Sequence, residues 1–238
     1  MFDQSLRRHL GAILGSVFLI TAATAAQARP QTPPVNLEGV WRIASPTSRL
    51  APVDGPVPFT AEGRARFAEN EGFKSRGEYD EYDITTSRCS NPGVPRLMLT
   101  PLRFKIWQRQ GVVTFDFEWN RAIRQIDMRG VPTEPALVPF MTGVSKGRWE
   151  GETLVALTTD ISDRTLLDEL TPHTDALRVT ERMRLVDANT LENRITIEDP
   201  AYFTRPWDAV VRYSRQPQAL FPEDVCLDRL PVRQPAQN

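Results

Sequence analysis

One histidine and one glutamate are the side chains of this sequence best suited to moving protons. His173 is the only histidine after the first 28 residues, and its ordinary pKa of about 6.5 lets an imidazole exchange protons near neutral pH. Glu181 follows in a run whose alternate residues, such as Val179 and Met183, are apolar. If this run is a β-strand, Glu181 lies on its apolar face, where burial raises the pKa of a carboxyl group toward values useful in acid–base catalysis.

Both residues also have a structural explanation. His173 belongs to a Pro-His-Thr-Asp turn, where an imidazole would only hydrogen-bond its own loop. Glu181 would form a buried ion pair if Arg124 or Arg164 lies within reach, and that pair would hold the carboxylate ionised. Arg182 is a poorer partner because neighbouring residues of a strand point to opposite faces. The sequence leaves these alternatives open.

Five further residues are expected to bind a substrate around this pair: Trp119, Arg124, Trp149, Asp160 and Arg164. Asp160 and Arg164 belong to an irregular segment after a predicted strand, where they would position a polar substituent or simply face solvent. A calcium site at Asp160 is disfavoured because this loop lacks an oxygen ligand at every second position. We therefore expect no metal site.

Trp119 ends a predicted strand whose alternation leaves two arrangements open. If Phe115 and Phe117 face the interior, they form the floor of a pocket together with Trp119. If these aromatic residues instead pack under the predicted helix, Asp116 and Glu118 line the cavity. Alternation alone does not decide which face of the strand is the inner one.

Motifs for nucleophilic, metal or nucleotide chemistry are absent from the sequence. There is no Gly-x-Ser-x-Gly, His-Glu-x-x-His or Walker pattern and no glycine-rich phosphate loop, so we expect no cofactor. Cys89 and Cys226 are the two cysteines, too far apart in sequence for a Cys-x-x-Cys redox pair. In an exported protein we expect them to form a disulfide that ties the tail to the body, with two buried thiols as the alternative.

The first 28 residues are typical of a secretory signal. A basic pair precedes an apolar run from Leu10 to Ile20, and Ala26-Gln27-Ala28 fits a small-x-small cleavage site, so cleavage after Ala28 is predicted. The apolar run is shorter than the roughly 20 residues that a membrane-spanning helix requires, so no membrane insertion is expected. These features predict a periplasmic or secreted protein in which residues 29–238 form one domain.

The charge balance argues against nucleic-acid binding. The chain has 29 basic and 30 acidic residues, a formal charge of −1, and removing residues 1–28 takes away one acid and two bases, which leaves −2. Nucleic-acid-binding domains usually carry a basic patch, whereas the arginines here alternate with acids along the predicted strands. We therefore expect no nucleic acid as a partner. The partner that we do expect is a small hydrophobic molecule held in the predicted barrel.

Regular alternation of apolar and polar residues predicts a mainly β fold. About nine short strands are joined mostly by hairpins, with tight turns at Gln110-Gly111 and Glu150-Gly151, a proline-rich loop over 131–140 and one short helix from Thr60 to about Asn70. The pattern favours an antiparallel up-and-down barrel or a strongly curled sheet, with a β-sandwich as the alternative. Gly39-Val40-Trp41 at the start of the first strand also resembles the way lipocalin-like barrels begin.

Three segments carry a resemblance to a family. Gly147-Arg148-Trp149-Glu150-Gly151, Pro172-His173-Thr174-Asp175-Ala176-Leu177 and Thr196-Ile197-Glu198-Asp199-Pro200 resemble motifs of a family of secreted bacterial proteins usually labelled uncharacterised, over about Cys89–Cys226. The chain departs from the family pattern at Leu166, where tryptophan is common in the family. The resemblance implies the same domain and motifs, and it implies no reaction.

Two functions fit these observations. The first is a cofactor-free acid–base enzyme, a lyase, dehydratase or isomerase, that encloses a small hydrophobic and in particular aromatic substrate in the barrel and moves protons with His173 and Glu181. The second is a lipocalin-like periplasmic carrier in which the same residues only orient the ligand. A barrel filled with side chains would instead indicate a structural envelope protein without a pocket.

Overall fold

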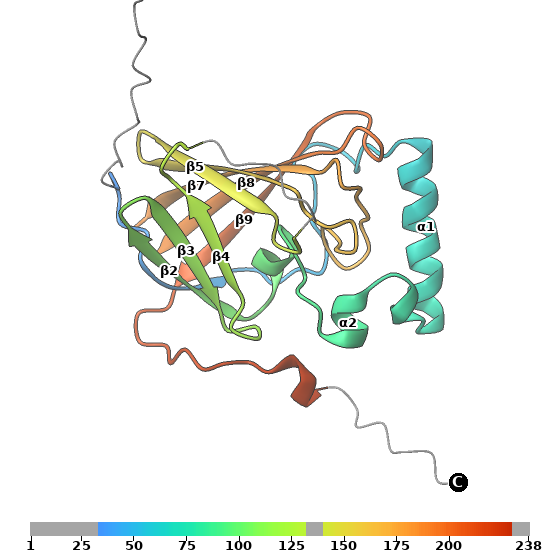
Figure 1. Cartoon of the computed structure of the whole chain (residues 1–238), viewed down its shortest axis with the longest axis horizontal. Helices are drawn as coiled ribbons and strands as arrows, with labels where there is room; N and C mark the ends of the chain where they lie inside the picture. Colours follow the sequence, from blue (N-terminus) through green and yellow to red (C-terminus); the bar gives the residue numbers. More distant parts are fainter. Residues whose placement is uncertain (1–32, 132–139, 230–238) are drawn as a thin grey trace, which may run out of the picture.

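Nine strands close into a barrel in the computed structural model, which describes residues 33–131 and 140–229 (Figure 1). Each strand pairs with its neighbours in sequence, and the last pairs with the first. The strands are β1 Gly39–Ile43, β2 Arg103–Arg109, β3 Val112–Phe117, β4 Ile123–Asp127, β5 Val144–Glu150, β6 Thr153–Thr159, β7 Arg178–Asp187, β8 Thr190–Glu198 and β9 Trp207–Arg215. The predicted barrel is therefore confirmed, and its closure excludes the β-sandwich.

One pair of strands departs from the expected up-and-down arrangement. β4 and β5 run parallel, joined only through Ile126 opposite Ser145 and Asp127 opposite Lys146. Parallel neighbours need a connection that crosses from one end of the barrel to the other, which a hairpin cannot provide. Residues 132–139 of the connection between β4 and β5, and with them most of the predicted proline-rich loop, lie outside the described residues.

Two glycines shape the hairpin turns. Gln110-Gly111 joins β2 to β3 as predicted, and Gly111 has a φ of +79°. The predicted turn at Glu150-Gly151 is shifted by one residue, because Glu150 still pairs with Thr153 and the two-residue loop is Gly151-Glu152. Gly151, with φ +57°, occupies the first loop position, where the tight turn needs the left-handed conformation that glycine adopts without steric cost.

The main helix is longer than predicted. α1 spans Ala61–Arg76, and the side chain of Thr60 caps its first turn by accepting a hydrogen bond from the backbone N–H of Gly63 at 3.0 Å. It continues past Asn70 and ends only at Gly77, whose φ of 72° stops the helix in the left-handed conformation.

A second helix and three single turns were not predicted. α2 spans Ile84–Arg88 and begins at Asp83, whose carboxylate accepts hydrogen bonds from Thr86. The 3-10 turns are η1 Tyr79–Glu81, η2 Arg96–Leu99 and η3 Cys226–Arg229. Such short elements carry little hydrophobic periodicity, so the expectation of one helix was incomplete. In the part of the chain that the structure covers, no helix has the length and apolar character needed to cross a bilayer.

The structure decides which face of β3 is the inner one. Phe115 and Phe117 are fully buried, and both rings pack against Phe104 of β2 inside the barrel. Asp116 and Glu118 point to the other face, where each is paired with an arginine. The aromatic side chains therefore contribute to a packed core, and the carboxylates do not line the interior.

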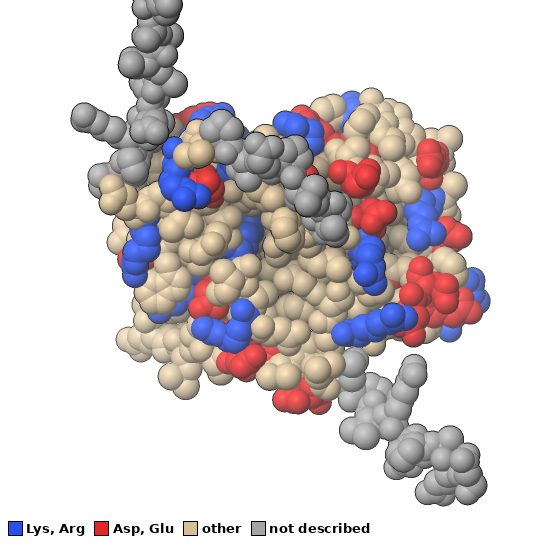
Figure 2. All heavy atoms as spheres, viewed as in Figure 1, with Lys and Arg blue, Asp and Glu red and all other residues tan. Residues whose placement is uncertain are grey.

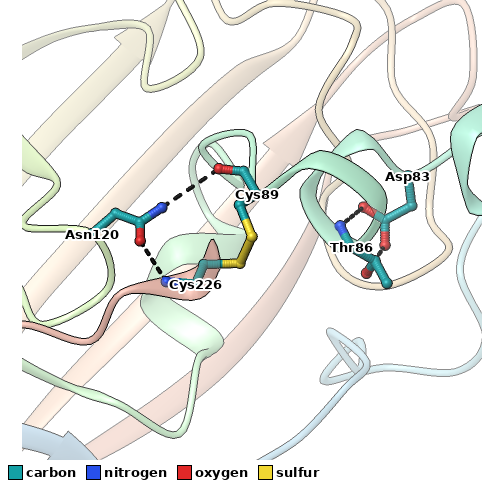
Figure 3. The surroundings of a disulfide bond; sticks show 5 residues. All are labelled: Asp83, Thr86, Cys89, Asn120 and Cys226. Carbon is teal, nitrogen blue, oxygen red and sulfur yellow. Dashed lines mark hydrogen bonds between the residues drawn. A yellow bond between two sulfur atoms is a disulfide. The ribbon is translucent and has the colours of Figure 1, made fainter. Parts of the chain in front are cut away.

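The predicted disulfide joins Cys89 to Cys226 across 137 residues of sequence (Figure 3). Asn120 holds the same junction, because its amide oxygen accepts from the backbone N–H of Cys226 at 2.7 Å and its amide nitrogen contacts the carbonyl of Cys89 at 3.5 Å. The disulfide fixes the C-terminal tail to the end of α2, and the Asn120 contacts connect both to the turn after β3. It confirms the pairing and excludes two free thiols.

Candidate functional site

Six consecutive strands each place one polar side chain in the interior of the barrel. These residues, which we call the polar belt, are Arg124 on β4, Ser145 on β5, Thr158 on β6, Glu181 on β7, Asn193 on β8 and Tyr213 on β9. None of them is more than 4 % exposed. A belt of polar groups at this depth requires internal hydrogen bonds, because burial without partners costs stability.

Arg124 and Glu181 form an ion pair at the centre of the polar belt. Arg124 also donates to the hydroxyl of Thr158 at 2.9 Å and to that of Ser145 at 3.2 Å, while Asn193 donates to the other oxygen of Glu181 at 2.9 Å. Glu181 therefore forms the buried ion pair that was the alternative to a catalytic role, with Arg124 as the partner. Such a pair holds the carboxylate by charge and hydrogen bonds on both oxygens.

Space for a ligand is missing around the four most deeply buried residues of the polar belt. Glu181, Thr158, Asn193 and Tyr213 have no accessible surface, and a void that could hold one water molecule would expose part of its lining. Burial, reinforced by the negative charge of Glu181, raises the pKa of Tyr213, so its phenol stays protonated. The barrel interior at this level is a packed polar core.

His173 lies elsewhere, in the irregular segment between β6 and β7. It is 3 % exposed, with Nδ1 2.8 Å from the carbonyl oxygen of Thr174 and Nε2 2.9 Å from the hydroxyl of Thr165. Burial lowers the pKa of His173, although the Thr174 carbonyl and the charges of Asp199 and Asp163 act in the opposite direction. The imidazole is therefore neutral at pH 7, and both of its ring nitrogens are hydrogen-bonded within this segment.

Two buried carboxylates hold this segment in place. Asp168 accepts hydrogen bonds from the backbone N–H groups of Leu170 and Thr171 at 2.9 and 2.8 Å. Asp199 accepts from the backbone N–H and the hydroxyl of Thr174 at 2.6 and 3.0 Å. These bonds turn an irregular loop inward and bury the neighbouring histidine. No pattern in the sequence predicts this task for either carboxylate.

The structure does not bring His173 and Glu181 together. Among the described contacts, Glu181 meets Arg124 and Asn193 inside the barrel, whereas His173 meets Thr165 and its own loop. The two sets of partners share no residue, and no described hydrogen bond joins them. A proton relay between His173 and Glu181 is therefore without geometric support.

A cavity of about 660 Å³ opens against His173, and we call it the His173 cleft. Its walls come from α1, from the η1–α2 region and from the segment before β7, which lie beside one another at one end of the barrel (Figure 1). The lining includes Arg66, Asn70, Tyr82, Arg88, Asp163, Arg164, Asp175 and Tyr202. The volume is in the range of about 300–1,000 Å³ that suits small-molecule sites.

Charged groups at the His173 cleft differ in whether they are paired. Arg88 and Asp80 pair with each other at 2.8 Å. By contrast, the exposed side chains of Asp163, Arg164 and Asp175 make no hydrogen bond or ion pair within the described part of the chain. Across the face seen in Figure 2, basic and acidic side chains are interleaved. The cleft therefore offers both charge signs to a ligand.

Three lining residues were not expected from the sequence. Asn70 is 1 % exposed; its amide nitrogen donates to the carbonyl of Leu170 at 2.9 Å, and its amide oxygen has no partner among the described residues. Burial, with the charge of Asp83 as a second cause, raises the pKa of Tyr82 to about 12. Burial also raises the pKa of Tyr202. Both phenols are therefore hydrogen-bond donors, and no sequence motif marks them.

The remaining expected site residues lie apart from His173. Trp119, 6 % exposed, lines a second cavity beside the disulfide. Trp149 is partly buried on β5 and packs against the core. Asp160 has a φ of +54° and accepts a hydrogen bond from Thr159 at 2.7 Å, which gives it a role in the turn after β6. Of the seven expected residues, only His173 and Arg164 share a cavity.

Comparison with known proteins gives no family assignment. The chain matches no protein family model and none of the curated proteins. The resemblance to secreted bacterial proteins therefore stays a prediction. Within residues 33–131 and 140–229, no group of three or more histidine, cysteine, aspartate or glutamate side chains is arranged to hold a metal ion.

Proposed function

We propose that this protein binds a small zwitterionic molecule in the His173 cleft. The observation that carries the proposal is the meeting of His173 and Arg164 at one open cavity of about 660 Å³. The sequence predicts both as site residues. A binding protein with a preformed polar cleft is supported better than a catalyst inside the barrel, because the polar belt leaves no space for a substrate.

Charge complementarity defines the ligand class. The guanidinium of Arg164 has no described internal partner, and its planar fork suits a carboxylate or a similar anion. Asp163 and Asp175 are likewise without described partners and suit an ammonium group. A molecule that carries both charges would satisfy the two sides of the cleft at once. This ligand is more polar than the hydrophobic molecule expected from the sequence.

Buried polar groups would orient such a ligand. The amide oxygen of Asn70 has no partner among the described residues and can accept a hydrogen bond from the ligand, while the phenol of Tyr202 can donate one to it. The α1 and loop walls are fixed to each other, because Asn70 donates to the carbonyl of Leu170 and Lys74 pairs with Glu169 at 2.8 Å. A fixed cleft loses less entropy on binding than a mobile one.

We also propose that the protein acts after export, in the periplasm or outside the cell. The disulfide between Cys89 and Cys226 supports this location, because such bonds persist in oxidising compartments. The signal over residues 1–28 lies outside the described residues and stays a prediction. A binding role in that compartment would make the protein a carrier or a receptor for its ligand.

Isothermal titration calorimetry with the common amino acids and glycine betaine tests this function. For each amino acid that binds, its amide and N-acetyl derivatives remove one charge and should bind about tenfold more weakly or worse, because each loses a charge-assisted hydrogen bond. Arg164→Ala should weaken zwitterion binding to a similar extent and should no longer distinguish the acid from its amide. Arg205→Ala, a change of an exposed arginine outside this cleft, is the matched control and should bind as the parent does. Absence of binding to every zwitterion at millimolar concentration, or an unaffected Arg164→Ala variant, would refute the proposal.

An acid–base enzyme is the second candidate, and the neutral imidazole of His173 at the cleft favours it. In that case an identified ligand would be converted to product, and His173→Gln would abolish turnover while the binding constant changed little. In a carrier, the same variant would change only the affinity. Product analysis after incubation with each bound zwitterion separates these outcomes.

A further inference from the structure

A second cavity lies across α2 from the His173 cleft, and we call it the tryptophan cleft. It has a volume of about 440 Å³. Thr85 and Thr86 of α2 line it, whereas Ile84 and Arg88 of the same helix line the His173 cleft. α2 is therefore a wall shared by two cavities.

The floor of the tryptophan cleft is apolar. Trp119 and Leu99 are 6 % and 4 % exposed and come from different parts of the chain, and both line this cavity. Pro92 is buried and Leu102 partly buried in the same lining. An indole with aliphatic and proline neighbours suits the face of an aromatic ring.

The charged groups at the tryptophan cleft are already neutralised. Arg96 donates two hydrogen bonds to Asp83 at 2.7 and 2.9 Å. Glu169 pairs with Lys74 at 2.8 Å, and Asp168 is occupied by backbone N–H groups of its own loop. None of these groups needs a charge from a ligand. This is the opposite of the His173 cleft, where Arg164 has no described partner.

Two hydroxyl groups are free to bind a ligand. The side chains of Ser48 and Thr85 make no hydrogen bond within residues 33–131 and 140–229, whereas those of Thr86 and Thr100 already donate to neighbouring oxygens. An apolar floor with free hydroxyls near it favours a flat ligand that carries a polar group. It disfavours ions, whose desolvation the apolar floor would not repay.

The walls are held together covalently and by hydrogen bonds. Cys226 lines the tryptophan cleft, and its disulfide to Cys89 fixes the end of α2, while Asn120 bonds the same tail to the turn that carries Trp119 (Figure 3). Asp83 caps α2 and also binds Arg96 on the opposite wall. A cavity with this many cross-connections is formed before a ligand arrives.

We propose that the tryptophan cleft binds a small aromatic molecule bearing a hydroxyl group, as a site separate from the His173 cleft. The ring would pack on Trp119 and Leu99, and the ligand hydroxyl would hydrogen-bond to Ser48 or Thr85. The two clefts differ in charge chemistry, and both α2 and the segment between β6 and β7 contribute residues to each of them. This site goes beyond the zwitterion-binding function and stands or falls independently of it.

Calorimetric titration of the full oxidised chain with 2-naphthol and p-cresol tests the second site. We expect one molecule bound per chain. Ser48→Trp fills the mouth with a bulky ring and should weaken binding about tenfold or more. Ser75→Trp, the same change at an exposed position of α1 that lines neither cleft, should bind as the parent does. Because both serines are exposed, neither change threatens folding, and thermal unfolding checks this.

Two further variants test the hydroxyl contact and the independence of the two clefts. Thr85→Val removes one hydroxyl at constant shape, so it should weaken the binding of 2-naphthol more than the binding of naphthalene. Arg164→Ala should leave 2-naphthol binding unchanged although it weakens zwitterions. The proposal is overturned if neither phenol binds, if Ser48→Trp binds 2-naphthol as well as Ser75→Trp does, or if Arg164→Ala weakens the phenol as much as the zwitterion.

Discussion

The hydroxyl of Thr165 lies 2.9 Å from Nε2 of His173 and 2.9 Å from the carbonyl oxygen of Ser162. A hydroxyl has one proton, and both neighbours act as acceptors when Nδ1 of the neutral ring donates to Thr174. The chain of contacts from the Thr174 carbonyl through His173 and the Thr165 hydroxyl to the Ser162 carbonyl thus has three hydrogen-bond positions. Only two protons are available to fill them. Only the imidazolium would supply the third, and burial opposes that charged form.

Folding stability should therefore fall as the pH drops below about 6.5. The pKa of His173 is lowered in the folded protein, so the unfolded chain takes up a proton first and is favoured. The stabilisation is complete above the unfolded pKa and is lost progressively toward the folded pKa, by about 1.4 kcal/mol per unit of difference. Urea unfolding from pH 7.5 to 5 measures this slope.

His173→Gln is the control for the pH dependence. His173 is the only histidine among the described residues, and the carboxylates with lowered pKa, such as Asp83 and Glu192, lose their stabilising effect only at more acidic pH. The variant should therefore unfold with nearly constant free energy across the same range, whatever its absolute stability. An equal slope in both proteins would assign the effect to another group.

Breaking the central ion pair of the polar belt should destabilise the barrel strongly. Arg124→Met leaves Glu181 charged in a site without accessible surface, which typically costs about 3–5 kcal/mol. The double variant with Glu181→Met removes both charges and should recover most of that loss. Urea midpoints of the two single variants and the double variant measure the coupling, and additive effects would contradict it.

Sequence pattern predicted the strands well because a half-buried strand alternates with period two. The placement of Glu181 inside and Arg182 outside follows from that rule, and Arg182 indeed pairs with Glu150 on the outer surface. The parallel pairing of β4 with β5 did not follow, because it depends on how the sheet closes. Alternation predicts which face of a strand each side chain lies on, whereas the way the sheet closes decides which strands are neighbours.

The site was less predictable than the fold for a physical reason. His173 is buried because Asp168 and Asp199 bond to backbone N–H groups of an irregular loop, and no period in the sequence encodes such bonds. The sequence offered Arg124 as one of several arginines that could pair with Glu181, and it did not decide between them. Asn70 was expected near the end of a helix, and its place at the cleft depends on how α1 docks.

Loss of the disulfide should lower stability and weaken the tryptophan cleft. Replacing Cys89 and Cys226 by serine opens a loop of 137 residues, and bonds that close loops of this order contribute about 4 kcal/mol. The end of α2 then loses its covalent tie, so 2-naphthol should bind more weakly. Urea unfolding measures the loss of stability, and calorimetry at a temperature where the variant is folded measures the binding of 2-naphthol. Zwitterion binding to the same variant is the comparison for the effect on the tryptophan cleft.

Two glycines of α1 should respond to alanine with opposite signs. A Cβ at Gly63 would lie 2.3 Å from the backbone carbonyl oxygen of Tyr202, which cannot move aside cheaply. A Cβ at Gly72 would meet only the end of the flexible Arg76 side chain at 3.2 Å. Gly72→Ala should therefore stabilise the helix by about 1 kcal/mol, since alanine is the better helix former. Gly63→Ala should destabilise the protein despite the same gain in propensity.

The Gly63 variant also tests whether docking of α1 forms the His173 cleft. Tyr202 lines that cleft, so a helix pushed away from Tyr202 should widen it and weaken zwitterion binding. Gly72→Ala leaves this contact intact and should bind as the parent does. Thermal unfolding and calorimetry on both variants measure the two effects. If Gly63→Ala were destabilised yet bound the zwitterion normally, the ligand would not depend on the wall that α1 and Tyr202 build.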